Sequence, residues 1–204
     1  MSSVLNRFMR ILETTNEIGP EMKFNSTKIS GCFEIDLKMI QDQRGEFARV
    51  FCQREFAEVD VDFKVAQSNF SKTIKTGSVR GLHYQVAPHA ESKLVRVDRG
   101  SIFDVCVDLR AGSSTFGQWH GAKLSAANRK MLLIPKGCAH GFQTLEDNCE
   151  MVYLHDEFYT PDCDRTAHHQ DPLFKIQWPL PISVVSEKDQ GAPYFSKDFK
   201  GIQL

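Results

Sequence analysis

Two histidines lie in segments that could bring them into one reactive pocket. His83 lies within Arg80–Gln85, and His140 closes the segment Pro135–His140. Near neutral pH an imidazole can accept or donate a proton. Taken alone, each histidine is better explained as a core residue bonded to the backbone. Taken together, with glycine and strand-like residues around both, they predict a shared pocket in a small β domain.

Alternating apolar and polar residues predict the strands that must position this pocket. We expect strands over Phe33–Leu37, Glu46–Phe51, Lys93–Val97, Ser101–Leu109 and Met131–Ile134, separated by glycine-containing turns. Many short strands at near-regular spacing are typical of an antiparallel sandwich or jelly roll. A short helix is expected over residues 53–58. The predicted fold class is therefore mainly β, with short flanking helices.

The length of 204 residues fits one domain with extensions. We expect an N-terminal arm over residues 1–27, in which residues 4–12 form a short amphipathic helix or a frayed terminus. A single domain is expected over residues 28–204. From about residue 161 its chain is rich in Pro, Asp and Phe, which predicts short helices and loops that wrap around the strands.

Composition argues against several classes of partner. The chain has 25 basic and 26 acidic residues and a net charge of −1, so we expect no nucleic-acid partner and no membrane partner. No apolar run is long enough to span a bilayer. Charged residues interrupt the start of the chain where a secretory signal would be apolar. The six cysteines form no C-x-x-C pair, and we expect reduced thiols in a cytoplasmic protein rather than three disulfides.

The histidine segments resemble the two halves of the cupin signature. Gly77, five residues and His83 resemble the first half, and Pro135-x-Gly137-x-x-His140 resembles the second. The resemblance implies a double-stranded β-helix, the cupin jelly roll. A metal-binding cupin usually has a second histidine where this chain has Gln85, and no glutamate stands at the expected ligand position. Since a transition metal needs about three ligands, we expect no metal, with a metal-dependent cupin isomerase or oxygenase as the alternative.

From about residue 29 to residue 179 the chain resembles the dTDP-4-dehydrorhamnose 3,5-epimerase family, a metal-free, cupin-type group of nucleotide-sugar enzymes. The order and spacing of the matching segments cover most of the chain. These segments are Asp42–Gly45, Arg80–Gln85, Lys93–Val97, Gly100–Val105, Ser114–Gly117 and Ile134–Phe142.

The resemblance implies epimerisation at C3 and/or C5 of a nucleotide-linked 4-keto-6-deoxyhexose, with no metal or redox cofactor. A 4-keto group acidifies the neighbouring C–H bonds, so inversion needs a base, an acid and a group that stabilises the enolate. The resemblance assigns His83 as the base and Asp171 as its partner carboxylate. It assigns Lys93 to the developing oxyanion and Tyr153 to reprotonation from the far face.

The resemblance also implies how a nucleotide-diphosphate sugar is bound. Arg44 and Arg80 match positions that contact the pyrophosphate or sugar, and Gln67 and Asn69 match a substrate-facing strand. His140 is expected to bond the sugar or to support His83. Phe158, where relatives have a tyrosine, is expected to stack on the base. The family is dimeric, which implies a homodimer; a catalytically idle sugar-nucleotide-binding protein is a further alternative.

Overall fold

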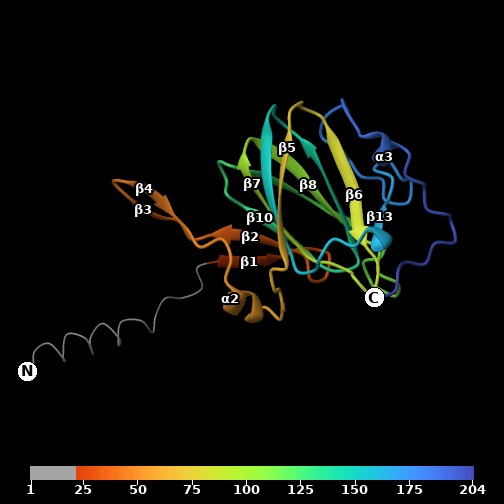
Figure 1. The fold of residues 1–204 in the computed structure, drawn as a ribbon, viewed down its shortest axis with the longest axis horizontal. Helices are drawn as coiled ribbons and strands as arrows, with labels where there is room; N and C mark the ends of the chain where they lie inside the picture. Colours follow the sequence, from red (N-terminus) through yellow and green to blue (C-terminus); the bar gives the residue numbers. More distant parts are fainter. Residues whose placement is uncertain (1–21) are drawn as a thin grey trace, which may run out of the picture.

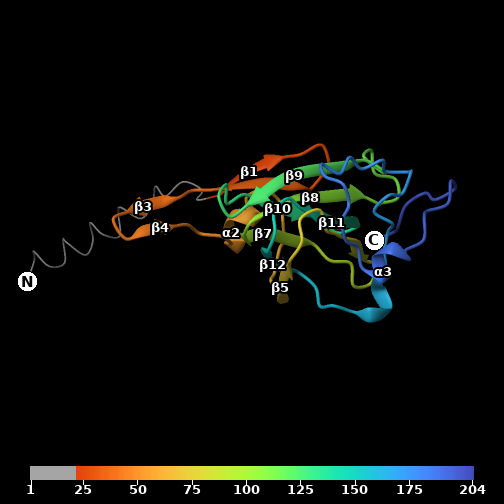
Figure 2. The same ribbon diagram turned by 90° about the horizontal axis from the view of Figure 1, so that it is seen from above.

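The computed structural model describes residues 22–204, which form two facing antiparallel β-sheets (Figure 1 and Figure 2). The six-stranded sheet has the spatial order β1-β2-β10-β7-β12-β5, and the five-stranded sheet has the order β13-β6-β11-β8-β9. Apart from β1–β2 and β8–β9, neighbouring strands in each sheet are not consecutive in the chain, as expected when a chain crosses between the sheets of a jelly roll. The mainly β fold is therefore confirmed.

The strands of the six-stranded sheet are, in spatial order, β1 (Met22–Ser26), β2 (Phe33–Leu37), β10 (Met131–Ile134), β7 (Lys93–Arg99), β12 (Cys149–His155) and β5 (Gln67–Thr73). Those of the five-stranded sheet are β13 (Asp164–Thr166), β6 (Val79–Gln85), β11 (Cys138–Thr144), β8 (Ser101–Asp108) and β9 (Trp119–Ser125). A separate hairpin consists of β3 (Ile40–Asp42) and β4 (Gly45–Phe47). The short helices are α2 (Gln53–Ala57), the 3-10 turn η1 (Pro161–Cys163) and α3 (Glu187–Gln190).

The core lies between the two sheets and explains the alternation in the sequence. Val95 and Val97 of β7 face Ile102 and Cys106 of β8 in one buried cluster, so alternate residues of each strand enter the core. A second cluster lies between the five-stranded sheet and the C-terminal segment, where Leu82 and Val105 meet Phe174. The C-terminal segment thus packs on the outer face of this sheet.

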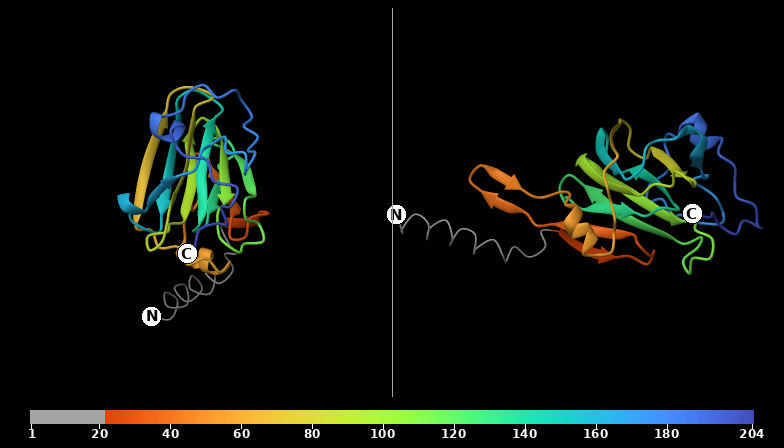
Figure 3. Two further views of the ribbon diagram at one scale, coloured as in Figure 1. Left: turned by 90° about the vertical axis from the view of Figure 1, so that its right-hand side faces the viewer. Right: turned by 60° about the horizontal axis from the view of Figure 1, so that its bottom comes forward.

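Two boundary predictions are wrong. The alternation over Glu46–Phe51 predicts one strand, but β4 ends at Phe47 because this hairpin extends beyond the sheets and lacks further strand partners (Figure 3). The arm predicted over residues 1–27 includes β1, which pairs with β2 along its whole length and belongs to the sheet. The helix predicted within residues 4–12 lies outside the described residues.

All six cysteines are free, which confirms the expectation of reduced thiols. In residues 22–204 no helix is long and apolar enough to cross a membrane. The helix predicted near residue 53 is present as α2.

Candidate active site

A cavity of about 530 Å³ opens between the two sheets and collects most of the predicted site residues. Strands β6 and β11 form one wall, whereas β5, β7 and β12 form the other. Seven of the ten predicted residues line it: Gln67, Asn69, Arg80, His83, Lys93, His140 and Tyr153. Residues that are distant in sequence, such as Gln67 and Tyr153, thus meet because the jelly roll interleaves its strands between the two sheets.

His83 is paired with Asp189 of α3. Its Nε2 lies 2.6 Å from Oδ1 of Asp189, whose other oxygen accepts a hydrogen bond from the N–H of Gly81 at 3.0 Å. Burial acts to raise the pKa of Asp189, but these hydrogen bonds and the charge of His83 outweigh it, so the pKa lies below its ordinary value. An ionised carboxylate only accepts, so Nε2 of His83 carries the hydrogen and Nδ1 is left as a base.

The assignment of Asp171 as the partner of His83 is wrong. Asp171 is buried, and its two oxygens accept hydrogen bonds from the backbone N–H groups of Leu173 (2.8 Å) and Phe195 (2.7 Å). Its carboxylate therefore fastens the C-terminal segment and does not enter the cavity. Asp189 lies 106 positions from His83 in sequence, in a segment that the motif analysis did not single out.

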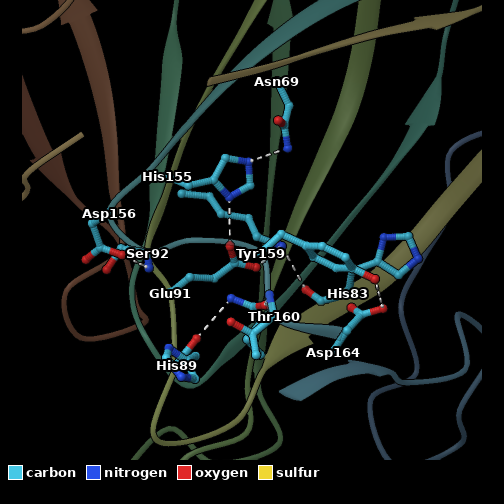
Figure 4. A network of polar contacts seen from close by, with 12 residues as sticks. Asn69, His83, His89, Glu91, Ser92, His155, Asp156, Tyr159, Thr160 and Asp164 are labelled. Carbon is cyan, nitrogen blue, oxygen red and sulfur yellow. Dashed lines mark hydrogen bonds and ion pairs between the residues drawn. The ribbon is translucent and has the colours of Figure 1, made fainter. Parts of the chain in front are cut away.

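Lys93 is held in a buried polar network on the opposite wall, shown in part in Figure 4. Its Nζ lies 3.0 Å from Oε1 of Glu91 and donates to the carbonyl of His83 at 3.3 Å. The other oxygen of Glu91 lies 2.7 Å from Nδ1 of His155, whose Nε2 lies 3.2 Å from the amide nitrogen of Asn69. Burial acts to raise the pKa of Glu91, but the bonds to His155 and Lys93 outweigh it and keep the pKa low. Sequence analysis missed His155 altogether.

His140 forms a second histidine–carboxylate pair, in the wall that also carries His83. Its Nε2 lies 2.7 Å from Oδ1 of Asp104, and both side chains are buried. Burial lowers the pKa of His140, and the nearby charges of Lys93 and His83 lower it further against the opposing effect of Asp104. A neutral His140 can therefore donate or accept a hydrogen bond at the cavity, but its lowered pKa makes it poorly suited to gain a proton.

Tyr153 faces the cavity from β12. Burial raises its pKa, and the charge of Asp104 raises it further, so the phenol stays protonated across the ordinary pH range. The ring packs against the core between the sheets and lies edge-on to His140, with centroids 5.9 Å apart. A neutral phenol that is held in place is a suitable proton donor.

The mouth of the cavity is basic and aromatic. Arg80, Lys188 and Tyr159 line it, and Lys188 Nζ is held 2.6 Å from Oδ2 of Asp164. The backbone N–H of Tyr159 donates to Oε1 of Gln67 at 2.8 Å, which ties the two cavity residues together. Cationic groups beside an aromatic face suit a phosphorylated aromatic ligand. Lys188 and Tyr159 were not predicted as site residues.

Two predicted binding residues lie elsewhere. Phe158 is 63% exposed and does not line the cavity; its neighbour Tyr159 does. Arg44 lies on the β3–β4 hairpin, which extends away from the sheets, and it pairs with Asp42 of the same turn (Figure 1). Within one chain Arg44 therefore does not reach the cavity. Among residues 22–204, no group of three or more His, Cys, Asp or Glu side chains is arranged to hold a metal ion.

Comparison with known proteins agrees with this arrangement. The family model described as dTDP-4-dehydrorhamnose 3,5-epimerase matches residues 26–197. This chain belongs to that family. The dTDP-4-dehydrorhamnose 3,5-epimerase of Shigella flexneri is 41% identical over 180 residues, which cover 87% of this chain and 99% of the relative. The chain is therefore an isomerase by family.

Two further members of the epimerase family bear on the substrate and the product. The dTDP-4-dehydrorhamnose 3-epimerase of Streptomyces niveus is 35% identical over 172 residues, covering 84% of this chain and 83% of the relative. The crystal structure of dTDP-4-dehydrorhamnose 3,5-epimerase from Bacillus anthracis, with TDP and PPi bound, superposes with a TM-score of 0.82. It is 37% identical, and the match covers 85% of this chain and 99% of that chain.

Proposed function

We propose that this chain epimerises C3, C5 or both of a nucleotide-linked 4-keto-6-deoxyhexose, with dTDP-4-dehydrorhamnose precursors as the leading substrate class. The observation that carries the proposal is the arrangement of one cavity. The His83–Asp189 pair enters from the five-stranded sheet, whereas Tyr153 and Lys93 enter from the six-stranded sheet. A base and an acid on different walls are what inversion of a carbon centre requires.

The proposed reaction begins at the carbon next to the keto group. Nδ1 of His83 accepts the proton, while Asp189 holds Nε2–H and stabilises the imidazolium that forms. The electron pair of the C–H bond moves into the enolate, whose oxygen is stabilised by the ammonium of Lys93. Tyr153 then donates its proton to the opposite face of the carbon. His83 and Tyr153 return to their starting states by exchange with water, so the substrate is only isomerised.

The residues at the mouth of the cavity support a nucleoside diphosphate as the part of the substrate by which it is bound. The guanidinium of Arg80 and the ammonium of Lys188 can bond phosphate oxygens, and Tyr159 offers a ring on which a base can stack. The epimerase from Bacillus anthracis, solved with TDP and PPi, supports the same class of ligand. We keep His140, Gln67 and Asn69 as proposed contacts to the sugar end of the cavity.

We also propose a homodimer. The β3–β4 hairpin extends from the sandwich and exposes Phe47 (66%) and Ile40 (52%), two apolar side chains that a second copy would cover (Figure 2). Arg44 lies at the turn of this hairpin, so pairing of two chains would allow it to act at the partner's cavity. The six free thiols support a cytoplasmic location.

The test is a panel of nucleotide-linked 4-keto-6-deoxy sugars incubated with the purified chain in heavy water and followed by NMR. The proposal expects solvent deuterium at C3, C5 or both, and an inverted product, with at least one member of the panel. Deuterium at C3 alone would identify a monoepimerase. Failure of every substrate to exchange would contradict the proposed function. Stoichiometric bound metal whose removal abolishes activity would instead favour the metal-dependent alternative.

A further inference from the structure

We propose that Glu91 and His155 position Lys93, and that they form one unit with it and with Asn69 at the six-stranded wall. The inference deepens the proposed function and rests on it for the role of Lys93 at the enolate. Neither Glu91 nor His155 is required by a general scheme of base, acid and oxyanion contact. Both are buried beside the cavity, with 8% of each side chain exposed.

Strand register brings the members of this unit together. His155 of β12 stands opposite Lys93 of β7 and opposite Gln67 of β5, since β12 lies between these two strands. Tyr153 precedes His155 by two residues and therefore shares its face of the sheet. One strand thus presents the proposed acid and a buried imidazole side by side, with ring centroids 6.3 Å apart.

The hydrogen bonds of Lys93 indicate that its ammonium group is held in one orientation. An ammonium has three donors. Two of them have acceptors, Oε1 of Glu91 at 3.0 Å and the carbonyl of His83 at 3.3 Å. One donor therefore remains for an oxygen in the cavity that Lys93 lines. Two of the three N–H groups are thus held, one by Glu91 just before β7 and one by His83 of β6. The remaining N–H group therefore has a limited range of directions.

His155 holds the carboxylate that does the anchoring. The ionised Glu91 accepts from Nδ1–H of His155, which leaves Nε2 to accept from the amide of Asn69. Both ring nitrogens are then engaged, so His155 is suited to hold Glu91 and not to transfer protons itself. Without this bond, Glu91 would keep a buried oxygen without a partner and would be free to rotate away from Lys93.

The first experiment observes the ammonium directly and needs no substrate. Protein labelled with ¹⁵N-lysine is examined for the ammonium resonance of Lys93, assigned by its loss in Lys93→Met. In the wild type we expect a resolved signal, because buried, hydrogen-bonded ammonium protons exchange slowly with water. His155→Phe keeps a ring but removes both nitrogens and should abolish the signal. His155→Asn can donate near the position of Nδ1 and should restore it.

The chain offers a matched control. His120 lies 2.9 Å from Glu34, and Lys130 lies 3.3 Å from the other oxygen of Glu34, so the same three residue types are joined away from the cavity. His120→Phe should leave the Lys93 signal as in the wild type. If His155→Phe does not fold, as judged by its thermal transition, Glu91→Gln tests the same contact from the other side.

The second experiment measures kinetics on the substrate identified by the panel. We expect His155→Phe to lower kcat about 10-fold to 100-fold with KM changed less than about twofold, because a displaced ammonium weakens the transition state more than the ground state. In the Lys93→Met background the same change should have no further effect on kcat. His155→Asn should recover most of the loss.

The outcomes separate this inference from the proposed function. A Lys93 signal that is absent from the wild type, or unchanged in His155→Phe, contradicts the positioning role whatever the enzyme catalyses. An equal loss of kcat from His155→Phe with and without Lys93 also contradicts it. If the signal behaves as expected but no substrate exchanges deuterium, the positioning role stands and the proposed function fails.

Discussion

At the scale of residues, His83 and His140 have the same kind of partner but different access to a ligand. Each places Nε2 within 2.7 Å of an aspartate oxygen. The side chain of His83 is 36% exposed, whereas that of His140 is 6% exposed and its pKa is lowered by burial. A base must both reach the substrate and hold the proton it removes. These requirements favour His83 as the base and leave His140 as a neutral hydrogen-bonding group.

Substitution of Asp189 and of Asp171, the two candidate partners of His83, should have different effects. Asp189→Asn should lower kcat roughly 100-fold, because it removes the charge that stabilises the imidazolium of His83. Asp171→Asn should leave kcat of the folded protein within about twofold but lower the free energy of unfolding by about 1–3 kcal/mol, because the new amide NH2 would face one of the two N–H groups from which the carboxylate accepts. Steady-state kinetics and denaturant unfolding of both variants measure these effects.

Equal losses of kcat in the two variants, at equal folded fractions, would contradict this division of roles. Folding of both variants must be checked, because Asp189 also has structural contacts. Its carboxylate accepts from the Gly81 N–H, and its own N–H donates to the hydroxyl of Ser186. Thermal transitions of both variants provide this check.

The failure to predict Asp189 has a physical reason. His83, Lys93 and Tyr153 were assigned through the family resemblance, and all three stand on regular strands of the two sheets, β6, β7 and β12. Asp189 stands in a four-residue helix of a segment without periodicity, and only folding brings it to β6. One local signal was present: Ser186 caps the helix by accepting from the N–H of Asp189, which is the serine half of a capping box.

At the scale of elements, the close approach of β6 and β11 depends on Gly81. A Cβ at this position would lie 2.5 Å from the carbonyl oxygen of His140 and 2.8 Å from Cα of Gly141. Its φ of +103° is also unfavourable for any residue with a side chain. Since β6 carries His83 and β11 carries His140, this glycine helps to set the distance between the two histidines.

Gly81→Ala should therefore lower the free energy of unfolding by about 3 kcal/mol or more, since the backbone contact cannot relax by moving a side chain. Gly112→Ala is the matched control: its φ is +75°, but nothing lies within 4 Å of the new Cβ. Backbone strain alone should lower the free energy of unfolding of this variant by about 1 kcal/mol. Denaturant unfolding curves compare the two variants. Equal losses of unfolding free energy would contradict the prediction and show that β6 and β11 can move apart at little cost.

The strands that bury one face were predicted well. Burial of one face requires apolar and polar residues to alternate, and this alternation is visible in the sequence. Four strands, β2, β7, β8 and β10, begin and end within two residues of their predicted bounds. The hairpin and β1 were not predicted correctly. The hairpin has no buried face within the chain, and β1 alternates only weakly over five residues, with a single buried side chain at Met22.

At the scale of the whole molecule, the two sheets hold different parts of the chemistry. The five-stranded sheet carries His83, His140 and Asp104, with Asp189 of α3 bonded to His83, and the six-stranded sheet carries Lys93 and Tyr153. The relative placement of the sheets therefore sets the distance from base to acid. That placement rests on the shared core, in which β7 and β8 pack face to face.

The proposed dimer makes a prediction at the same scale. The wild type should sediment at twice the mass of the chain. Phe47→Ser should shift the equilibrium towards monomer by about 10-fold or more in Kd, because it removes an exposed aromatic side chain from the hairpin. Leu173→Ser, which removes another exposed apolar side chain outside the hairpin, should leave the mass unchanged. A wild type that sediments as a monomer at micromolar concentration would contradict the dimer.

The most direct test of the central claim measures solvent deuterium incorporation next to the keto group by wild type, His83→Asn and Tyr153→Phe. If His83 is the base and Tyr153 the acid, His83→Asn loses exchange by at least about 100-fold. Tyr153→Phe still exchanges deuterium but forms little inverted product, because the proton returns from the side it left. Undiminished exchange by folded His83→Asn would contradict the account.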